Sequence, residues 1–222
     1  MSREAGQRIR TATSAFVGLL AEHTDADWSV AADTIEWSCR TTLTHLVEVT
    51  VHWCARVAVR SDDNLVAAVD VADDATVDEL LGTFQAFGEV LASVVGQLGP
   101  DERAFHNGGR ADASGWAAMF GCEVAVHAGD ICGGLGVPNA PDVFDPTAAS
   151  VVQRLFPWAT GDEPAWDRLL WATGRRSLDG FPAMGSEWIW HAAPLAEWDG
   201  TVPVWTPETD APTRRARPTL PA

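Results

Sequence analysis

Apolar residues recur every three or four positions through most of residues 1–176, the spacing that places them on one buried face of a helix. A first such stripe predicts a helix over residues 5–23 and consists of Ile9, Ala12, Phe16, Val17 and Leu20. A second stripe consists of Leu43, Val47, Thr50, Cys54 and Val57. Ser38 precedes it and can cap the start of a long helix, which we expect to end near Arg60.

A capping sequence marks the start of a third helix. Thr76 and Glu79 have the T-x-x-E spacing of a capping box, and an apolar run from Leu80 to Val94 follows directly. We expect this helix to begin at about residue 77 and to stop at the Gly-Pro pair 99–100. Four helices are therefore expected before residue 135, because one more segment carries the same spacing.

That fourth segment has its apolar positions at Trp116, Phe120, Val124, Val126 and Ile131. We expect it to end at the glycine pair 133–134, where glycine can adopt the left-handed cap conformation. Asp145 and Pro146 predict the N-cap and first turn of a fifth helix, and residues 165–173 predict a short sixth one. Beyond Gly180 the periodicity fades, and we expect an irregular tail that frays after about residue 206.

These elements predict an all-α fold, a four-helix bundle with additional C-terminal helices and an irregular tail. The 222 residues give room for one main domain and a smaller appendage. We divide the chain into a helical bundle, residues 1–178, and a C-terminal extension rich in Trp and Pro, residues 179–222. Apolar residues form 46% of the chain and charged residues 21%, a balance that is sufficient for a closed core.

The charge of the chain excludes two classes of partner. With 15 Lys and Arg against 31 Asp and Glu, its field repels nucleic acid and anionic membrane surfaces. No apolar run approaches the roughly 18–20 residues of a membrane span, and the N-terminus lacks the apolar segment of a signal peptide. We therefore expect a cytoplasmic protein. The four cysteines show no CxxC spacing and are expected to be reduced and structural.

One pair of residues on the fourth helix points to a metal. Glu123 and His127 lie four residues apart, so their side chains project from the same face. His45, within the second helix, can face them, and helical bundles assemble metal sites from facing helices in this way. An E-x-x-x-H pair can also be a weak surface ion pair. Here the pair lies among apolar residues, where a charge needs a partner, and this favours a metal site.

His52 competes with His45, because seven residues restore nearly the same direction on a helix. The two are about 10 Å apart along the axis at 1.5 Å per residue, so only one can join Glu123 and His127. His52 is then either a group that faces the substrate or a surface histidine. Arg56, one turn further on, is a candidate for binding a substrate carboxylate with its planar fork of donors, although an exposed helix arginine is the alternative.

Three segments of the chain resemble the DinB-like superfamily and, within it, the mycothiol-dependent maleylpyruvate isomerase family. The resemblance covers roughly residues 5–176. It rests on Trp37-Ser38 with Thr44-His45-Leu46, on the segment from Glu123 to Asp130, and on the segment from Leu169 to Arg175.

The resemblance implies a DinB-like bundle that binds one divalent metal, commonly zinc, with nickel as the alternative. In that family one His of the second helix and a Glu and a His of the fourth hold the metal, and these match His45, Glu123 and His127. Asp130 matches the family pattern too, either as a helix-end carboxylate or as a group behind the ligands. The isomerase also carries a sterol-carrier-like α/β domain whose substrate-binding arginine matches no residue here, because residues 181–222 are too few and too rich in Trp and Pro.

Two His and one carboxylate leave open positions on zinc, which is typical of a catalytic site. The resemblance implies that mycothiol or a similar low-molecular-weight thiol is the cosubstrate, and a dication would stabilise its thiolate. The sequence therefore predicts a metal-dependent thiol transferase or thiol-assisted isomerase that acts on a small electrophilic substrate. Two alternatives stay open. One is a hydrolase or lyase that uses metal-bound water, and the other is a non-catalytic, metal-stabilised binding module that dimerises through its Trp-bearing surfaces.

Overall fold

A computed structural model describes residues 1–65, 69–138, 140–184 and 188–205. Within these residues the chain forms helices and three isolated bridges but no strand, which confirms the all-α class. The six α-helices are α1 (Ser2–Leu20), α2 (Cys39–Ala58), α3 (Val77–Gly96), α4 (Ala113–Leu135), α5 (Ala140–Leu155) and α6 (Ala165–Ala172). Two short 3-10 helices are η1 (Ala21–His23) and η2 (Leu195–Glu197).

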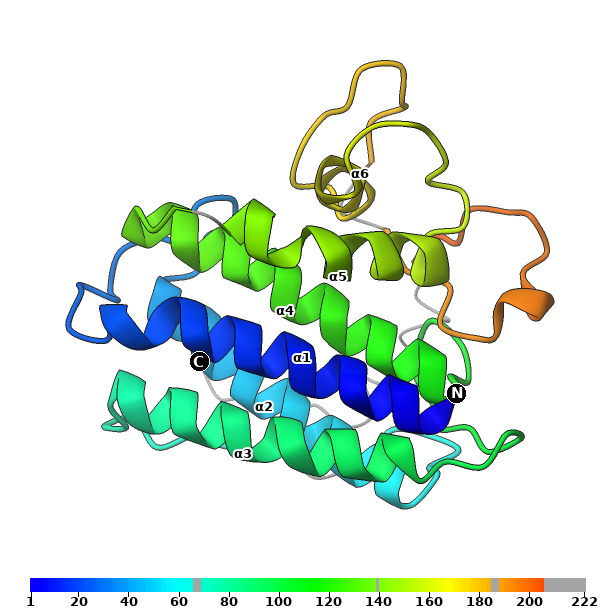
Figure 1. The fold of residues 1–222 in the computed structure, drawn as a ribbon, viewed down its shortest axis with the longest axis horizontal. Helices are drawn as coiled ribbons and strands as arrows, with labels where there is room; N and C mark the ends of the chain where they lie inside the picture. Colours follow the sequence, from blue (N-terminus) through cyan, green and yellow to red (C-terminus); the bar gives the residue numbers. More distant parts are fainter. Residues whose placement is uncertain (66–68, 139, 185–187, 206–222) are drawn as a thin grey trace, which may run out of the picture.

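The first four helices form the bundle. Helices α1 and α2 each pack against both α3 and α4, so α3 and α4 lie at opposite corners. Helix α5 covers α4, and the short α6 crosses above α5, where Figure 1 shows it nearly end-on. The core between the helices is closed by large side chains with almost no exposed surface, among them Phe16, Leu43, Phe84 and Trp116.

Helix starts follow the capping residues of the sequence. The Ser38 hydroxyl accepts the backbone N–H of Thr41 at 3.1 Å and caps α2. Thr76 and Glu79 form the expected capping box of α3, with the Thr76 N–H donating to the Glu79 carboxylate at 2.7 Å. Both predictions are confirmed, and the cap of α2 fixes the helix that carries His45.

The predicted end of α4 at the glycine pair 133–134 is wrong. The helix continues to Leu135 and ends at Gly136, which has the left-handed conformation with φ 68°. The glycine pair serves close packing instead. A Cβ atom on Gly134 would lie 2.4 Å from the carbonyl oxygen of Ala31, and one on Gly133 would lie 2.5 Å from Cβ of Asp33. The loop before α2 therefore rests directly on the last turns of α4.

The predicted start of α5 at Asp145 and Pro146 is also wrong. The helix begins at Ala140, so Pro146 lies inside it. Asp145 does not act as its N-cap, and its carboxylate accepts the backbone N–H of Trp166 at 3.2 Å. This bond links α5 to the first turn of α6, which runs within the range expected from the sequence.

The described part of the C-terminal extension packs back onto the bundle. Backbone N–H groups of His191 and Ala192 donate to the carbonyls of Leu155 and Gly108, each at 2.9 Å. The Arg154 guanidinium also donates to the carbonyl of Ala192, at 3.1 Å. The frayed end expected after about residue 206 lies outside the described residues, and the division of the chain at residue 178 stays a prediction.

All four cysteines are buried and free. No helix in the described ranges is long and apolar enough to cross a membrane.

Candidate metal centre

The structure brings His45, Glu123 and His127 together between α2 and α4. One donor atom from each lies within 4.8 Å of the other two. The Glu123 carboxylate is central, because its Oε2 atom lies 3.4 Å from Nε2 of His45 and 3.3 Å from Nε2 of His127. The four-residue spacing on α4 and the cap of α2 thus produce one compact cluster of two imidazoles and one carboxylate.

His127 is held in a defined orientation from behind. Its Nδ1 atom lies 2.9 Å from Oδ2 of Asp130, one turn further along α4. Because the carboxylate of Asp130 accepts from Nδ1, the other ring nitrogen, Nε2, is the one that faces Glu123. A histidine that ligates a metal commonly donates its second ring N–H to a carboxylate in this way. Asp130 therefore lies behind the cluster. The sequence had offered this role and that of a helix-end carboxylate as alternatives.

Asp130 is itself fixed by residues from two other segments. Arg175, which follows α6, donates Nη2 to Oδ2 at 2.9 Å and Nε to Oδ1 at 3.1 Å. The hydroxyl of Thr34, in the loop before α2, donates to Oδ1 as well. Only 1% of the Asp130 side chain is exposed, so these bonds replace its hydration almost completely.

The electrostatics of the cluster follow from burial and from these pairs. Burial raises the pKa of Glu123, but hydrogen bonds from His127 and His45 outweigh it and hold this pKa below its usual range. Burial also opposes ionisation of Asp130, yet the bonds from His127 and Arg175 lower its pKa to about 2. For His127, burial lowers the pKa, and the bonds to Asp130 and Glu123 raise it above the usual value. Two carboxylates are thus ionised beside a histidine that readily takes a proton.

The donor set fits a divalent metal ion. Two imidazole nitrogens and one carboxylate oxygen are the ligands that zinc and nickel accept, and three protein ligands leave positions for further groups. The three residues also differ in exposure in the way an open site requires. The His127 side chain is 8% exposed, Glu123 17% and His45 33%, so the cluster opens to solvent on the side of His45.

An aromatic residue forms the wall of this opening. The ring of Trp37 lies 5.0 Å from that of His45 and is stacked at 6.3 Å on that of His127, measured between centroids. Trp37 is nevertheless 42% exposed, which is unusual for so large an apolar side chain. Beyond its place in the sequence motif, nothing in the sequence indicated that Trp37 would lie against the two histidines.

The two residues predicted to contact substrate lie further along α2. His52 takes no part in the cluster, and its Nε2 atom accepts Nε of Arg56 at 2.8 Å. Arg56 is buried, with 7% of its surface exposed, which differs from the exposed helix arginine weighed as an alternative. A role of either residue in binding substrate stays a prediction.

Comparison with known proteins identifies the family to which the chain is similar. A sequence model of the DinB superfamily matches residues 8–131, more than half of the chain. This range includes most of α1, all of α2 and α3 and most of α4, and with them all three members of the cluster. Among curated proteins and solved structures, none matches the chain.

Proposed function

The chain belongs to the DinB superfamily, and from this membership and its His/Glu/His cluster we propose that it is a metal-dependent enzyme that activates a low-molecular-weight thiol. The thiol would transfer to a small electrophilic substrate or assist its isomerisation. The observation that carries the proposal is the mutual approach of His45, Glu123 and His127 to within 4.8 Å, with Asp130 behind His127.

Each residue of the centre has a separate task in this proposal. His45, Glu123 and His127 hold the ion, and Asp130 keeps Nε2 of His127 directed at it. A divalent ion at this place supplies a positive charge that lowers the pKa of a bound thiol, so that a thiolate nucleophile is present at neutral pH. Trp37 borders the open side and offers a flat apolar surface to the substrate.

The choice of a thiol rests on the resemblance to the mycothiol-dependent maleylpyruvate isomerase branch of the superfamily. The segments that carry this resemblance contribute to the centre. They provide Trp37, His45, the residues from Glu123 to Asp130, and Arg175. Zinc is the proposed metal, with nickel as the alternative. Mycothiol or a similar thiol is the proposed cosubstrate.

Elemental analysis of protein purified without a metal-affinity tag tests the centre itself. We expect about one divalent ion per chain, which His45→Ala and His127→Ala each lose. His52→Ala is the matched control, because His52 lies on the same helix but outside the cluster. Metal retained in His45→Ala and lost in His52→Ala would contradict the assignment of the ligands. Absence of metal together with no uptake of zinc, nickel or cobalt would overturn the proposal.

Cobalt substitution tests the thiol. Addition of mycothiol to the cobalt protein should produce a sulfur-to-metal charge-transfer band and release a proton to weakly buffered solution. The S-methylated thiol is the control, since the four native cysteines could give a similar band. A spectrum that responds to azide but to none of mycothiol, glutathione and cysteine would exclude thiol activation and favour hydrolysis with water as the nucleophile.

A further inference from the structure

Three arginine side chains of the described chain are nearly buried, and one of them differs from the others. Arg154 pairs with Asp112 at 3.1 Å, and Arg175 pairs with Asp130 at 2.9 Å. Arg56 is 7% exposed and has no carboxylate within ion-pair distance among the described residues. A buried cation without a counter-charge is costly, because the protein does not replace the hydration it has lost. Asp63 acts on Arg56 only from beyond ion-pair distance, where its charge raises the Arg56 pKa that burial lowers to about 10.

The contacts of Arg56 satisfy only part of its guanidinium. Nε donates to Nε2 of His52 at 2.8 Å, Nη2 donates to the side-chain carbonyl of Asn64, and the ring of Phe105 lies 5.9 Å away. None of these three neighbours carries a negative charge. The Nη1 nitrogen has no acceptor among the described residues. It is not among the polar atoms that are sealed from solvent without a partner, so it keeps some contact with solvent.

A second donor comes from the loop between α3 and α4. Nδ1 of His106 accepts two N–H groups, from the backbone of Gly108 at 3.2 Å and from the indole of Trp190 at 3.3 Å. An imidazole nitrogen that accepts hydrogen bonds carries no proton, so the proton of His106 resides on Nε2. This N–H has no acceptor among the described residues and is likewise not sealed from solvent.

A further N–H group, on α4, is sealed from solvent and closes the site from below. Trp116 is fully buried, and its indole Nε1–H has no hydrogen-bond partner, which is rare for a buried tryptophan. Its ring packs edge-on against those of His106, at 6.0 Å, and Trp53, at 5.6 Å. The rings of Trp53 and His106 are also 6.0 Å apart. One aromatic cluster therefore contains two unpaired N–H groups, of which only that of His106 keeps contact with solvent, and the charge of Arg56 acts on His106.

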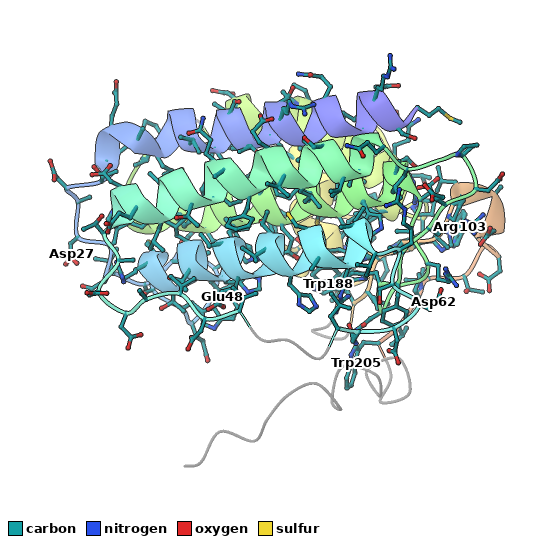
Figure 2. All side chains as sticks on the ribbon, turned by 90° about the horizontal axis from the view of Figure 1, so that it is seen from below. Asp27, Glu48, Asp62, Arg103, Trp188 and Trp205 are labelled. Atoms are coloured by element: carbon teal, nitrogen blue, oxygen red, sulfur yellow. The ribbon has the colours of Figure 1, made fainter. Side chains whose placement is uncertain are left out.

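The cluster lies at the other end of the seam between α2 and α4 from the candidate metal centre. Trp116 and Glu123 are seven residues apart on α4, which corresponds to about 10 Å along the axis. Arg56 follows His45 by eleven residues on α2, and its side chain extends back along the helix to His52. The C-terminal extension borders this end, because Trp190 packs on His106 and Trp188 on Trp190. In the view of Figure 2, Trp188 projects onto the C-terminal half of α2.

We propose that Arg56 and His106 form an oxyanion site that binds a carboxylate of the substrate or of the thiol. This inference rests on the proposed function, because it places the carboxylate roughly 10 Å from the group that reaches the metal ligands. A carboxylate accepts up to four hydrogen bonds and supplies the direct ion pair that Arg56 lacks among the described residues. The site therefore selects an elongated acidic molecule and rejects the neutral analogue, which leaves the donors unpaired.

Thermal unfolding with sodium glutarate at constant ionic strength tests the site in the metal-free full chain. At ten times the dissociation constant the melting temperature of the wild type should rise by roughly 3 °C, and Arg56→Met should show no rise. Arg10→Met is the matched control, because Arg10 is an exposed arginine paired with Glu89, and it should keep the full rise. Without anion, Arg56→Met should melt within about 2 °C of the wild type or above it, since a buried unpaired charge has been removed.

A measurement on the wild type covers the case in which Arg56→Met does not fold. The Nε2–H proton of His106, assigned by comparison with His106→Gln, should move downfield in the NMR spectrum as glutarate is added. An equal melting rise in Arg56→Met and the wild type would overturn the proposal. So would a wild type in which neither the melting temperature nor this proton responds. A response to sulfate but not to glutarate would overturn the choice of carboxylate.

The two sources of the carboxylate are distinguished with the metal-loaded enzyme. Dimethyl glutarate, which lacks the charge, should not bind in either case. If the carboxylate belongs to the thiol, glutarate competes with glutathione; if it belongs to the electrophile, both bind together. The unfolding and NMR experiments use metal-free protein. They can therefore contradict the carboxylate site while elemental analysis confirms the metal centre, or support the carboxylate site while elemental analysis finds no metal.

Discussion

Replacement of Asp130 by asparagine separates the role of this residue in folding from its role in the metal centre. The Asp130 side chain is 1% exposed and accepts from His127, from Thr34 and from Arg175. Asparagine keeps one acceptor oxygen and turns the other position into an NH₂ donor. At that position the donor meets N–H groups of its neighbours, and the buried guanidinium of Arg175 loses its counter-charge.

The expected magnitude follows from these contacts. Breaking one partner of a buried ion pair costs about 3–5 kcal/mol of unfolding free energy, because the remaining charge stays buried without compensation. Loss of the hydrogen bond behind a ligating histidine lowers metal affinity by about 10–100-fold. We therefore expect Asp130→Asn to show both losses, with the metal still bound at saturating concentration because His45, Glu123 and His127 remain.

Arg175→Met and the double variant make this prediction refutable. Urea unfolding of the metal-free protein should show that Asp130→Asn/Arg175→Met recovers most of the stability lost by Asp130→Asn, since no unpaired charge is left. Competitive zinc titration should show that the double variant does not recover metal affinity, because Nδ1 of His127 still lacks its carboxylate. Recovery of both quantities together, or of neither, would refute the division of roles.

Two further predictions concern other parts of the structure. Burial lowers the pKa of His106 to about 3, so the folded chain stays neutral there while the unfolded histidine takes a proton. The free energy of unfolding should fall by about 2 kcal/mol from pH 7 to pH 5, and His106→Gln should lose this part of the fall in urea titrations at both pH values. Gly134→Ala should destabilise the chain by about 1–3 kcal/mol, because its Cβ would lie 2.4 Å from the carbonyl of Ala31; an unchanged melting temperature would contradict this packing.

Local chemistry explains what could be predicted from the sequence. The caps at Ser38 and Thr76 involve residues three positions apart, and the pairing of Glu123 with His127 involves four. The rise of a helix per residue excluded joint ligation by His45 and His52, the family resemblance favoured His45, and only His45 lies in the cluster. Each of these relations is set within one helix, where spacing in the sequence is spacing in space.

Relations between distant segments were missed. The glycine pair 133–134 has the appearance of a helix end, yet its lack of side chains allows the loop of residues 31–33 to approach. Asp145 and Pro146 have the appearance of a helix start, yet Asp145 binds a neighbouring helix. Arg175 was named only as the end of a segment that carries the family resemblance, and the fold brings it to Asp130. No periodicity reports such contacts, because they depend on how helices pack and not on how each one forms.

Residues from α2, α4, the segment after α6 and the loop before α2 form or support the candidate centre. The loop before α2 contacts both helices that carry the proposed ligands. The loop before α2 carries Thr34, which binds Asp130, and Trp37, which borders the two histidines. It is fixed to α4 by the backbone N–H of Asp33, which donates to the carbonyl of Asp130 at 2.9 Å, and by its contact with Gly134. A displaced loop would therefore move the wall of the site and the support of His127 at once. Since a centre of this kind needs its ligands held to within about 0.5 Å, close packing of the loop on α4 is part of the site and not only of the fold.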